Sequence, residues 1–151
     1  TNLGGVMEHY PKRCYSGAGW TLANQRLLEL SLKNGSSLPC TIYQFVRGNL
    51  QPEKVMVLNY LITDKHTIGE ISLLRTKMWR IFEMTNYVAQ VQIVIFSGGI
   101  LTDDSMANIV SDFAVESASS INRIFDDISK ELSFTEEQSD INDTYVKLKG
   151  S

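Results

Sequence analysis

Residues 90–99 read Gln-Val-Gln-Ile-Val-Ile-Phe-Ser-Gly-Gly, and this stretch decides the predicted fold. Val91 to Phe96 is a nearly continuous run of apolar, strand-forming residues, and two glycines end it. Side chains at alternate positions of a strand point to opposite faces, and here apolar residues occur on both faces. We therefore expect this strand to be buried. Beyond residue 100 the apolar positions recur at helical spacing, so the stretch marks the border between a β part and an α part of the chain.

The α part is expected to begin at Thr102, whose hydroxyl can cap a helix while Asp103 and Asp104 complement its dipole. The predicted core face of this helix consists of Met106, Ile109, Val110, Phe113 and Ala114. A second helix is expected to restart at Ser119 or Ser120, with an apolar stripe of Ile121, Ile124, Phe125, Ile128 and Leu132. Residues 135–138 match the capping box of a short last helix, and Tyr145, Val146 and Leu148 predict an edge strand.

The β part is read from turn residues and alternating apolar positions. Residues 1–24 show neither the strand period nor the helix period of apolar residues, so we predict an N-terminal loop. Alternating leucines from Leu28, the pair Asn34-Gly35 and the β-rich stretch 41–46 predict a hairpin; the alternative is a helix over residues 22–33. Residues 54–62 predict a strand that is apolar on both faces.

Residues 70–82 fit both the two-residue period of a strand and the 3.6-residue period of a helix. Ile71, Leu73 and Trp79 recur at strand spacing, whereas Ile71, Leu74 and Met78 recur at helical spacing. We favour a strand, because residues 85–87 would then form a turn into the apolar stretch 91–96.

Length and composition predict one α+β domain. A chain of 151 residues with 43% hydrophobic residues can bury a single core. Residues 25–99 are expected to be mainly β and residues 100–140 mainly α, so an antiparallel sheet should pack against a C-terminal helical bundle. The isolated domain is expected to be a monomer.

Charge is distributed unevenly along the chain. The first hundred residues hold ten Lys/Arg and six Asp/Glu, whereas the remaining fifty-one hold four and eleven. This asymmetry suggests an acidic helical end that faces a partner; the alternative is a solvated helix surface. It argues against a basic, phosphate-neutralising surface in the C-terminal half.

No residue pattern predicts catalysis, a cofactor or a metal. Cys14 and Cys40 lack metal-ligand spacing and are expected to be reduced thiols, and His9 and His66 are far apart in sequence. No apolar run is long enough to span a membrane, so we expect an excised intracellular domain with no membrane partner. Recognition of a methylated base remains possible, because it needs only two aromatic side chains and an acid.

The order of several segments resembles the cap-binding domain of the orthomyxovirus polymerase basic subunit two. The segments, in order, are Lys33-Asn34-Gly35-Ser36-Ser37, Gly48-Asn49-Leu50-Gln51, Lys54-Val55-Met56-Val57, Leu74-Arg75-Thr76-Lys77 and Gln92-Ile93-Val94-Ile95-Phe96-Ser97-Gly98. The similarity covers about residues 28–116 and points to a divergent, thogotovirus-like member. It implies a domain that holds the 7-methylguanosine cap of host RNA during cap snatching and catalyses nothing itself. It also implies a heterotrimeric viral polymerase, located in the host nucleus and the virion.

At most positions where the family contacts its ligand, this sequence has a different type of residue. Its stacking residue falls on Leu58 and its base-reading acid near Ile62, and both are aliphatic here. Its second stacking aromatic falls on Glu116. Lys77 lies where the family places a lysine, and Tyr15 or Trp20 lies near the loop aromatic. We therefore expect a retained fold with weak or absent cap binding; the alternative is a rebuilt pocket in which Tyr15, Trp20, Lys77 and Glu116 converge on one cleft.

Overall fold

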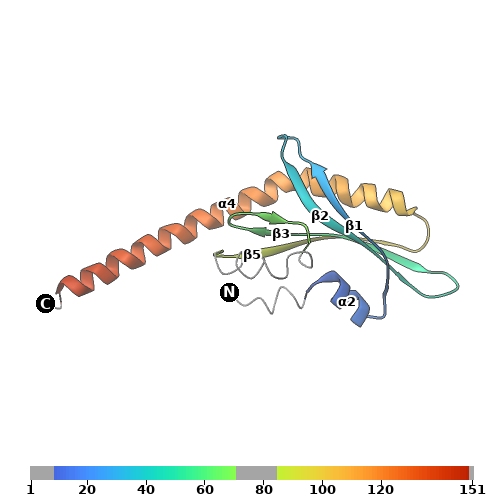
Figure 1. Cartoon of the computed structure of the whole chain (residues 1–151), viewed down its shortest axis with the longest axis horizontal. Coiled ribbons are helices and arrows are strands. Elements are labelled where there is room, and N and C mark those ends of the chain that lie inside the picture. Colours follow the sequence, from blue (N-terminus) through green and yellow to red (C-terminus); the bar gives the residue numbers. More distant parts are fainter. Residues whose placement is uncertain (1–8, 71–84, 150–151) are drawn as a thin grey trace. The chain divides into compact units, whose positions relative to one another are not determined.

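The computed structural model describes residues 9–70 and 85–149 and has an α+β fold (Figure 1). The elements are α2 (Pro11–Gly17), β1 (Thr21–Ser31), β2 (Ser37–Arg47), β3 (Glu53–Thr63), β4 (Thr67–Ile68), β5 (Val88–Ser97) and α4 (Asp103–Lys149). The α+β class and the antiparallel sheet are confirmed. The chain divides into two compact units, residues 1–118 and 119–151, and the five described strands lie in the first.

The predicted hairpin is confirmed as β1 and β2, which pair antiparallel from Thr21 opposite Val46 to Ser31 opposite Ser37. Gly35 adopts a φ of +84° in the turn, a conformation that costs glycine little, and the Asn34 side chain accepts a hydrogen bond from the Ser36 amide at 3.0 Å. The alternative helix over residues 22–33 is therefore wrong, because the turn chemistry decides between the two periods.

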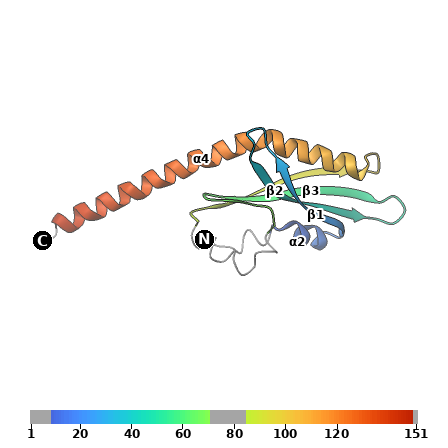
Figure 2. The ribbon, with the colours of Figure 1, turned by 45° about the horizontal axis from the view of Figure 1, so that its top comes forward.

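Strand β3 lies between β2 and β5 and pairs antiparallel with both. Every residue of β3 from Val55 to Thr63 is buried, as its apolar sequence predicts. Alternation divides the sheet into two faces. We name the face that carries Tyr43, Phe45, Val55 and Val57 the aromatic face. The opposite face, which carries Ile42, Met56 and Leu58, is named the helix face, because the first turns of α4 lie over it (Figure 2).

Helix α4 begins as predicted. The Thr102 hydroxyl accepts a hydrogen bond from the Ser105 amide at 3.1 Å, and Asp103 forms an ion pair with Lys54 of β3 at 2.7 Å. Met106, Val110, Ala114 and Ala118 are buried at four-residue intervals. The predicted core positions Ile109 and Phe113 are instead exposed, because they lie to one side of this face.

The expectation that β5 is buried is wrong, because every residue from Val88 to Phe96 is partly or largely exposed. Val94 and Phe96 are exposed, with Phe96 at 66%. Short helix α2 packs mainly against β1 and β2, while the His9 carbonyl and the Trp20 ring reach β5, where they contact Gln92 and Phe96. An apolar run thus predicts a strand here, but it does not say which elements cover the strand.

The predicted N-terminal loop over residues 1–24 is also wrong in its described part. Residues 11–17 form α2, and β1 already begins at Thr21. Pro11 occupies the first turn, where its fixed φ favours a helix and its missing N–H costs nothing. A helix of seven residues is too short to show a 3.6-residue period in sequence, which explains why the pattern missed it.

The helical bundle is replaced by one helix. Neither the restart at Ser119 or Ser120, nor the third helix from residue 135, nor the edge strand at 145–148 exists, because α4 continues to Lys149. No glycine or proline occurs between residues 100 and 149, and serine can remain helical by bonding backward, as the Ser117 hydroxyl does to the Phe113 carbonyl at 2.7 Å. The expected strand or helix within residues 70–82 lies outside the described residues except at Glu70.

Candidate functional site

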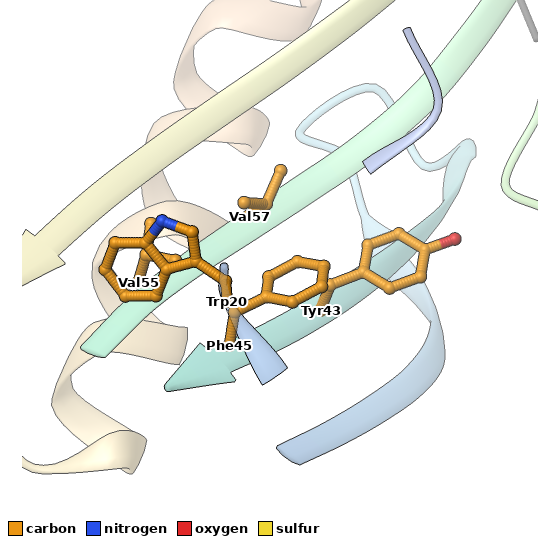
Figure 3. Close-up of a cluster of buried hydrophobic side chains, with 5 residues drawn as sticks. All are labelled: Trp20, Tyr43, Phe45, Val55 and Val57. Carbon is orange, nitrogen blue, oxygen red and sulfur yellow. The ribbon is translucent and has the colours of Figure 1, made fainter. Parts of the chain in front are cut away.

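Aromatic rings gather where α2, β1, β2 and β5 meet on the aromatic face. Tyr15 stacks on Phe45 with ring centroids 4.7 Å apart, and its edge contacts Trp20 at 6.3 Å. Trp20 also contacts Phe96 of β5 at 6.3 Å. The rings of Trp20, Phe45 and Tyr43 follow one another along the face above Val55 and Val57 (Figure 3). We call Tyr15, Trp20, Tyr43, Phe45 and Phe96 the aromatic cluster.

Local backbone structure places Trp20 in this cluster. Helix α2 ends at Gly17, and Gly19 adopts a φ of +80°, which reverses the chain. The Trp20 amide then donates to the Tyr15 carbonyl at 3.0 Å, so the two aromatic side chains start close together. The guanidinium of Arg47 lies 4.4 Å from the centre of the Trp20 ring, a cation–π contact that covers the indole.

A buried carboxylate lies next to the cluster. Glu70 is 3% exposed, and its oxygens accept hydrogen bonds from the hydroxyls of Tyr10 and Tyr43 and from the side-chain amide of Gln25. The Tyr43 and Gln25 contacts measure 2.7 and 2.8 Å. These four side chains, which we call the tyrosine–glutamate network, join β1, β2 and the segment after β4 to the residue that precedes α2.

Burial is the main cause that raises the pKa of Tyr43 well above its usual range, followed by its hydrogen bonds with Tyr10 and Glu70. The phenol therefore stays protonated and remains a donor to the carboxylate. Buried polar groups in which every donor finds an acceptor fix a unique packing arrangement. The network is thus suited to hold the aromatic face in place.

The two aliphatic positions that the resemblance assigns to a ligand belong to the core. Leu58 is 0% exposed and Ile62 is also buried, and both lie on β3 with side chains on the helix face. A ligand cannot reach either side chain without opening the core that buries them. The third position, Glu116, is exposed on α4 and forms an ion pair with Lys33 of the β1–β2 turn at 2.8 Å.

The structure brings Tyr15 and Trp20 together but keeps them apart from Glu116. The two aromatic residues lie on the aromatic face, whereas Glu116 belongs to the helix that covers the helix face. Lys77 lies outside the described residues. The three described members of the alternative pocket therefore do not converge on one cleft. Phe45 already occupies a face of Tyr15, and Trp20 is only 8% exposed, so the pair leaves no open slot for a base.

Sequence reasoning missed Tyr10 and Glu70 as partners of Tyr43. One signal was present: Tyr43 alternates with Phe45 along a strand, and a buried tyrosine hydroxyl needs a hydrogen-bond partner. The pattern could not identify that partner, because Glu70 is 27 residues away and reaches Tyr43 only through the sheet.

Direct binding of the methylated cap is expected to be absent. The resemblance places its two stacking aromatics on Leu58 and Glu116, and the absence of both, at about 1–3 kcal/mol per stacked base, corresponds to a loss on the order of two to four decades of affinity. We expect no saturable change in tryptophan fluorescence or heat when the chain is titrated to millimolar 7-methyl-GTP, with unmethylated GTP as the control. Micromolar binding selective for the methylated base would contradict the placement of Leu58 and Ile62.

No family model matches the chain, and neither a curated protein nor a solved structure is significantly similar to it. Among the side chains that the structure describes, which end at residue 131, His, Cys, Asp and Glu form no group of three that could hold a metal ion. No helix in the described part of the chain carries an apolar stretch of the length that a bilayer crossing requires. Cys14 and Cys40 form no disulfide bond.

Proposed function

We propose that this chain is a non-catalytic interaction module that binds a partner protein through the C-terminal half of α4. The observation that carries the proposal is an apolar stripe that remains exposed. Ile124 is 57% exposed and Ile128 is 37% exposed, although the sequence places both in a core stripe. Ile121 lies one turn before Ile124 on the same side of the helix.

Such a helix needs a partner for its stability. Isolated helices are marginal in water, and most of their stability in proteins comes from packing of an apolar face. A helix with anchors at positions 121, 124 and 128 has the spacing with which amphipathic helices fill a hydrophobic groove. The partner surface is therefore expected to contain an apolar groove about two turns long.

Charge indicates what borders this groove. Asp126, Asp127 and Glu131 are exposed on the same helix segment, against Arg123 and Lys130. The last fifty-one residues carry eleven acidic and four basic side chains. Because opposite potentials steer association and suppress wrong partners, a groove flanked by Lys and Arg fits best.

The sequence resemblance supports one particular setting for this module. It implies that the partners are the other subunits of a heterotrimeric viral RNA polymerase in the host nucleus and the virion. In that setting capped host RNA binds weakly or not at all through this domain. The buried positions of Leu58 and Ile62 support this part of the proposal.

Photo-crosslinking in the native cell tests the helix surface. A photoreactive amino acid at position 124 or 128 is expected to cross-link to one protein with a basic, apolar groove. The same group at Asp126, on the opposite side of the helix, should not, and Ile124→Asp with Ile128→Asp should abolish complex formation. The purified chain should sediment as a monomer. A homodimer that the double substitution dissociates, or equal cross-linking from position 126, would contradict the proposal.

A further inference from the structure

The tip of the β1–β2 hairpin carries the only Asn-Gly pair of the sequence, at Asn34 and Gly35. The tip lies at the top of Figure 1, and residues 33–37 are all exposed. In any protein the backbone nitrogen that follows an asparagine can attack the side-chain amide carbon and close an imide ring. A side chain on the following residue obstructs this attack, and glycine has none. Asn34 is therefore the asparagine of this chain with the least hindered route to such a ring.

The structure leaves room for the attack. A methyl group placed on Gly35 would meet no atom of the described chain within 4 Å, so the turn is not packed against a neighbouring element. The Gly35 amide donates a hydrogen bond to the Leu32 carbonyl at 3.0 Å. This bond lies at the exposed tip, where water can replace it when the nitrogen turns toward the Asn34 side chain.

Ser36 polarises the group that is attacked. Its amide and its hydroxyl both donate hydrogen bonds to Asn34 Oδ1, at 3.0 and 2.7 Å. Attack on the side-chain amide carbon moves negative charge onto this oxygen. Donors that already lie at hydrogen-bond distance from an oxygen that gains charge stabilise the intermediate, as in the oxyanion hole of acyl-transfer enzymes. The turn therefore favours attack at Asn34 before any rearrangement occurs.

We propose that Asn34 is a site of spontaneous deamidation, promoted by the two hydrogen bonds from Ser36. A base, hydroxide in water, removes the Gly35 amide proton, and the nitrogen forms a bond to Asn34 Cγ. The bond from Cγ to Nδ2 breaks, and the leaving nitrogen takes up a proton from water and departs as ammonia. Water then opens the imide, either at Cγ to give aspartate or at the backbone carbonyl carbon to give isoaspartate. The net reaction consumes one water and releases one ammonia, and nothing is oxidised or reduced.

Both products change the contact between the hairpin and α4. Lys33, next to Asn34, forms an ion pair with Glu116 of α4 at 2.8 Å. A new carboxylate at position 34 competes for this cation, because the existing pair is exposed and weak. Isoaspartate also adds a carbon to the backbone inside the turn that the hydrogen bond from the Leu32 amide to the Ser36 carbonyl, at 2.8 Å, closes. Because the reaction does not reverse in water, modified chains accumulate with time.

Timed mass spectrometry of the full chain tests this site. The purified chain is incubated in mildly alkaline buffer and digested, and each asparagine is followed for conversion of its amide to an acid. The exposed residues Asn24, Asn49 and Asn108, which precede Gln, Leu and Ile, are the internal controls. We expect Asn34 to convert at least roughly tenfold faster than each control, which corresponds to a barrier lower by about 1.4 kcal/mol. Chromatography should resolve both isoaspartate and aspartate at position 34, because opening of the imide yields both.

Two substitutions test the contribution of the turn. Ser36→Ala removes the hydroxyl donor and is expected to slow the conversion of Asn34. Ser37→Ala, which removes the next exposed hydroxyl along the chain, should leave the rate unchanged, and both variants should keep the circular dichroism spectrum of the parent chain.

Three results would overturn the proposal: conversion of Asn34 no faster than that of the controls, aspartate without isoaspartate, or an undiminished rate in Ser36→Ala. The first two are measured on the unsubstituted chain, so they decide the matter even when a variant does not fold.

Discussion

Glu70→Ala is expected to lower the free energy of unfolding by about 2–4 kcal/mol. The substitution removes the acceptor for Tyr10, Tyr43 and Gln25 at a site that is almost fully buried. Each buried donor that loses its acceptor costs the full free energy of its desolvation, about 1–3 kcal/mol. The two phenols can recover part of this loss by bonding to each other, since their oxygens already lie 2.7 Å apart.

Urea unfolding followed by circular dichroism measures the loss. Glu70→Gln keeps an acceptor oxygen and is expected to cost less than Glu70→Ala. The surface control Glu53→Ala removes an exposed carboxylate that pairs with Arg47, and such pairs contribute about 0–1 kcal/mol. A loss below 1 kcal/mol for Glu70→Ala would show that the network does not hold the aromatic face.

The sheet could be predicted from sequence because its signals are local. The Asn34-Gly35 turn, the doubly apolar strand from Val55 and the helix cap at Thr102 each depend on a few neighbouring residues. The unbroken helix α4 was missed for the opposite reason. The Ser119-Ser120 pair predicts a new start, although no glycine or proline is present to end the helix that precedes it.

The candidate site could not be predicted to the same degree, because it depends on contacts far apart in the chain. The resemblance places Tyr15 or Trp20 near a ligand, and the structure brings these two residues together. Whether an aromatic ring is core or binding platform depends on what covers it, and here Phe45 and Arg47 cover the two rings. No sequence period contains that information.

The second large effect is a loss of stability at alkaline pH. Burial raises the pKa of the Cys40 thiol to about 11 and that of Tyr60 to about 12, and raises the pKa of Tyr43 further above its usual range. In the unfolded chain these groups release their protons near pH 8.5–10. Above that range the unfolded state binds fewer protons than the folded state, so stability falls as pH rises.

Each such group contributes a slope of about 1.4 kcal/mol per pH unit above its unfolded pKa. Between pH 9 and pH 11 the total loss is on the order of 5 kcal/mol, comparable with the whole stability of a small domain. Urea midpoints at pH 8, 9, 10 and 11 should therefore fall steadily. Cys40→Ala is expected to flatten the first part of this decline and Tyr43→Phe the part above pH 10. A flat profile to pH 11 would mean that these side chains ionise as readily in the folded protein as in the unfolded chain.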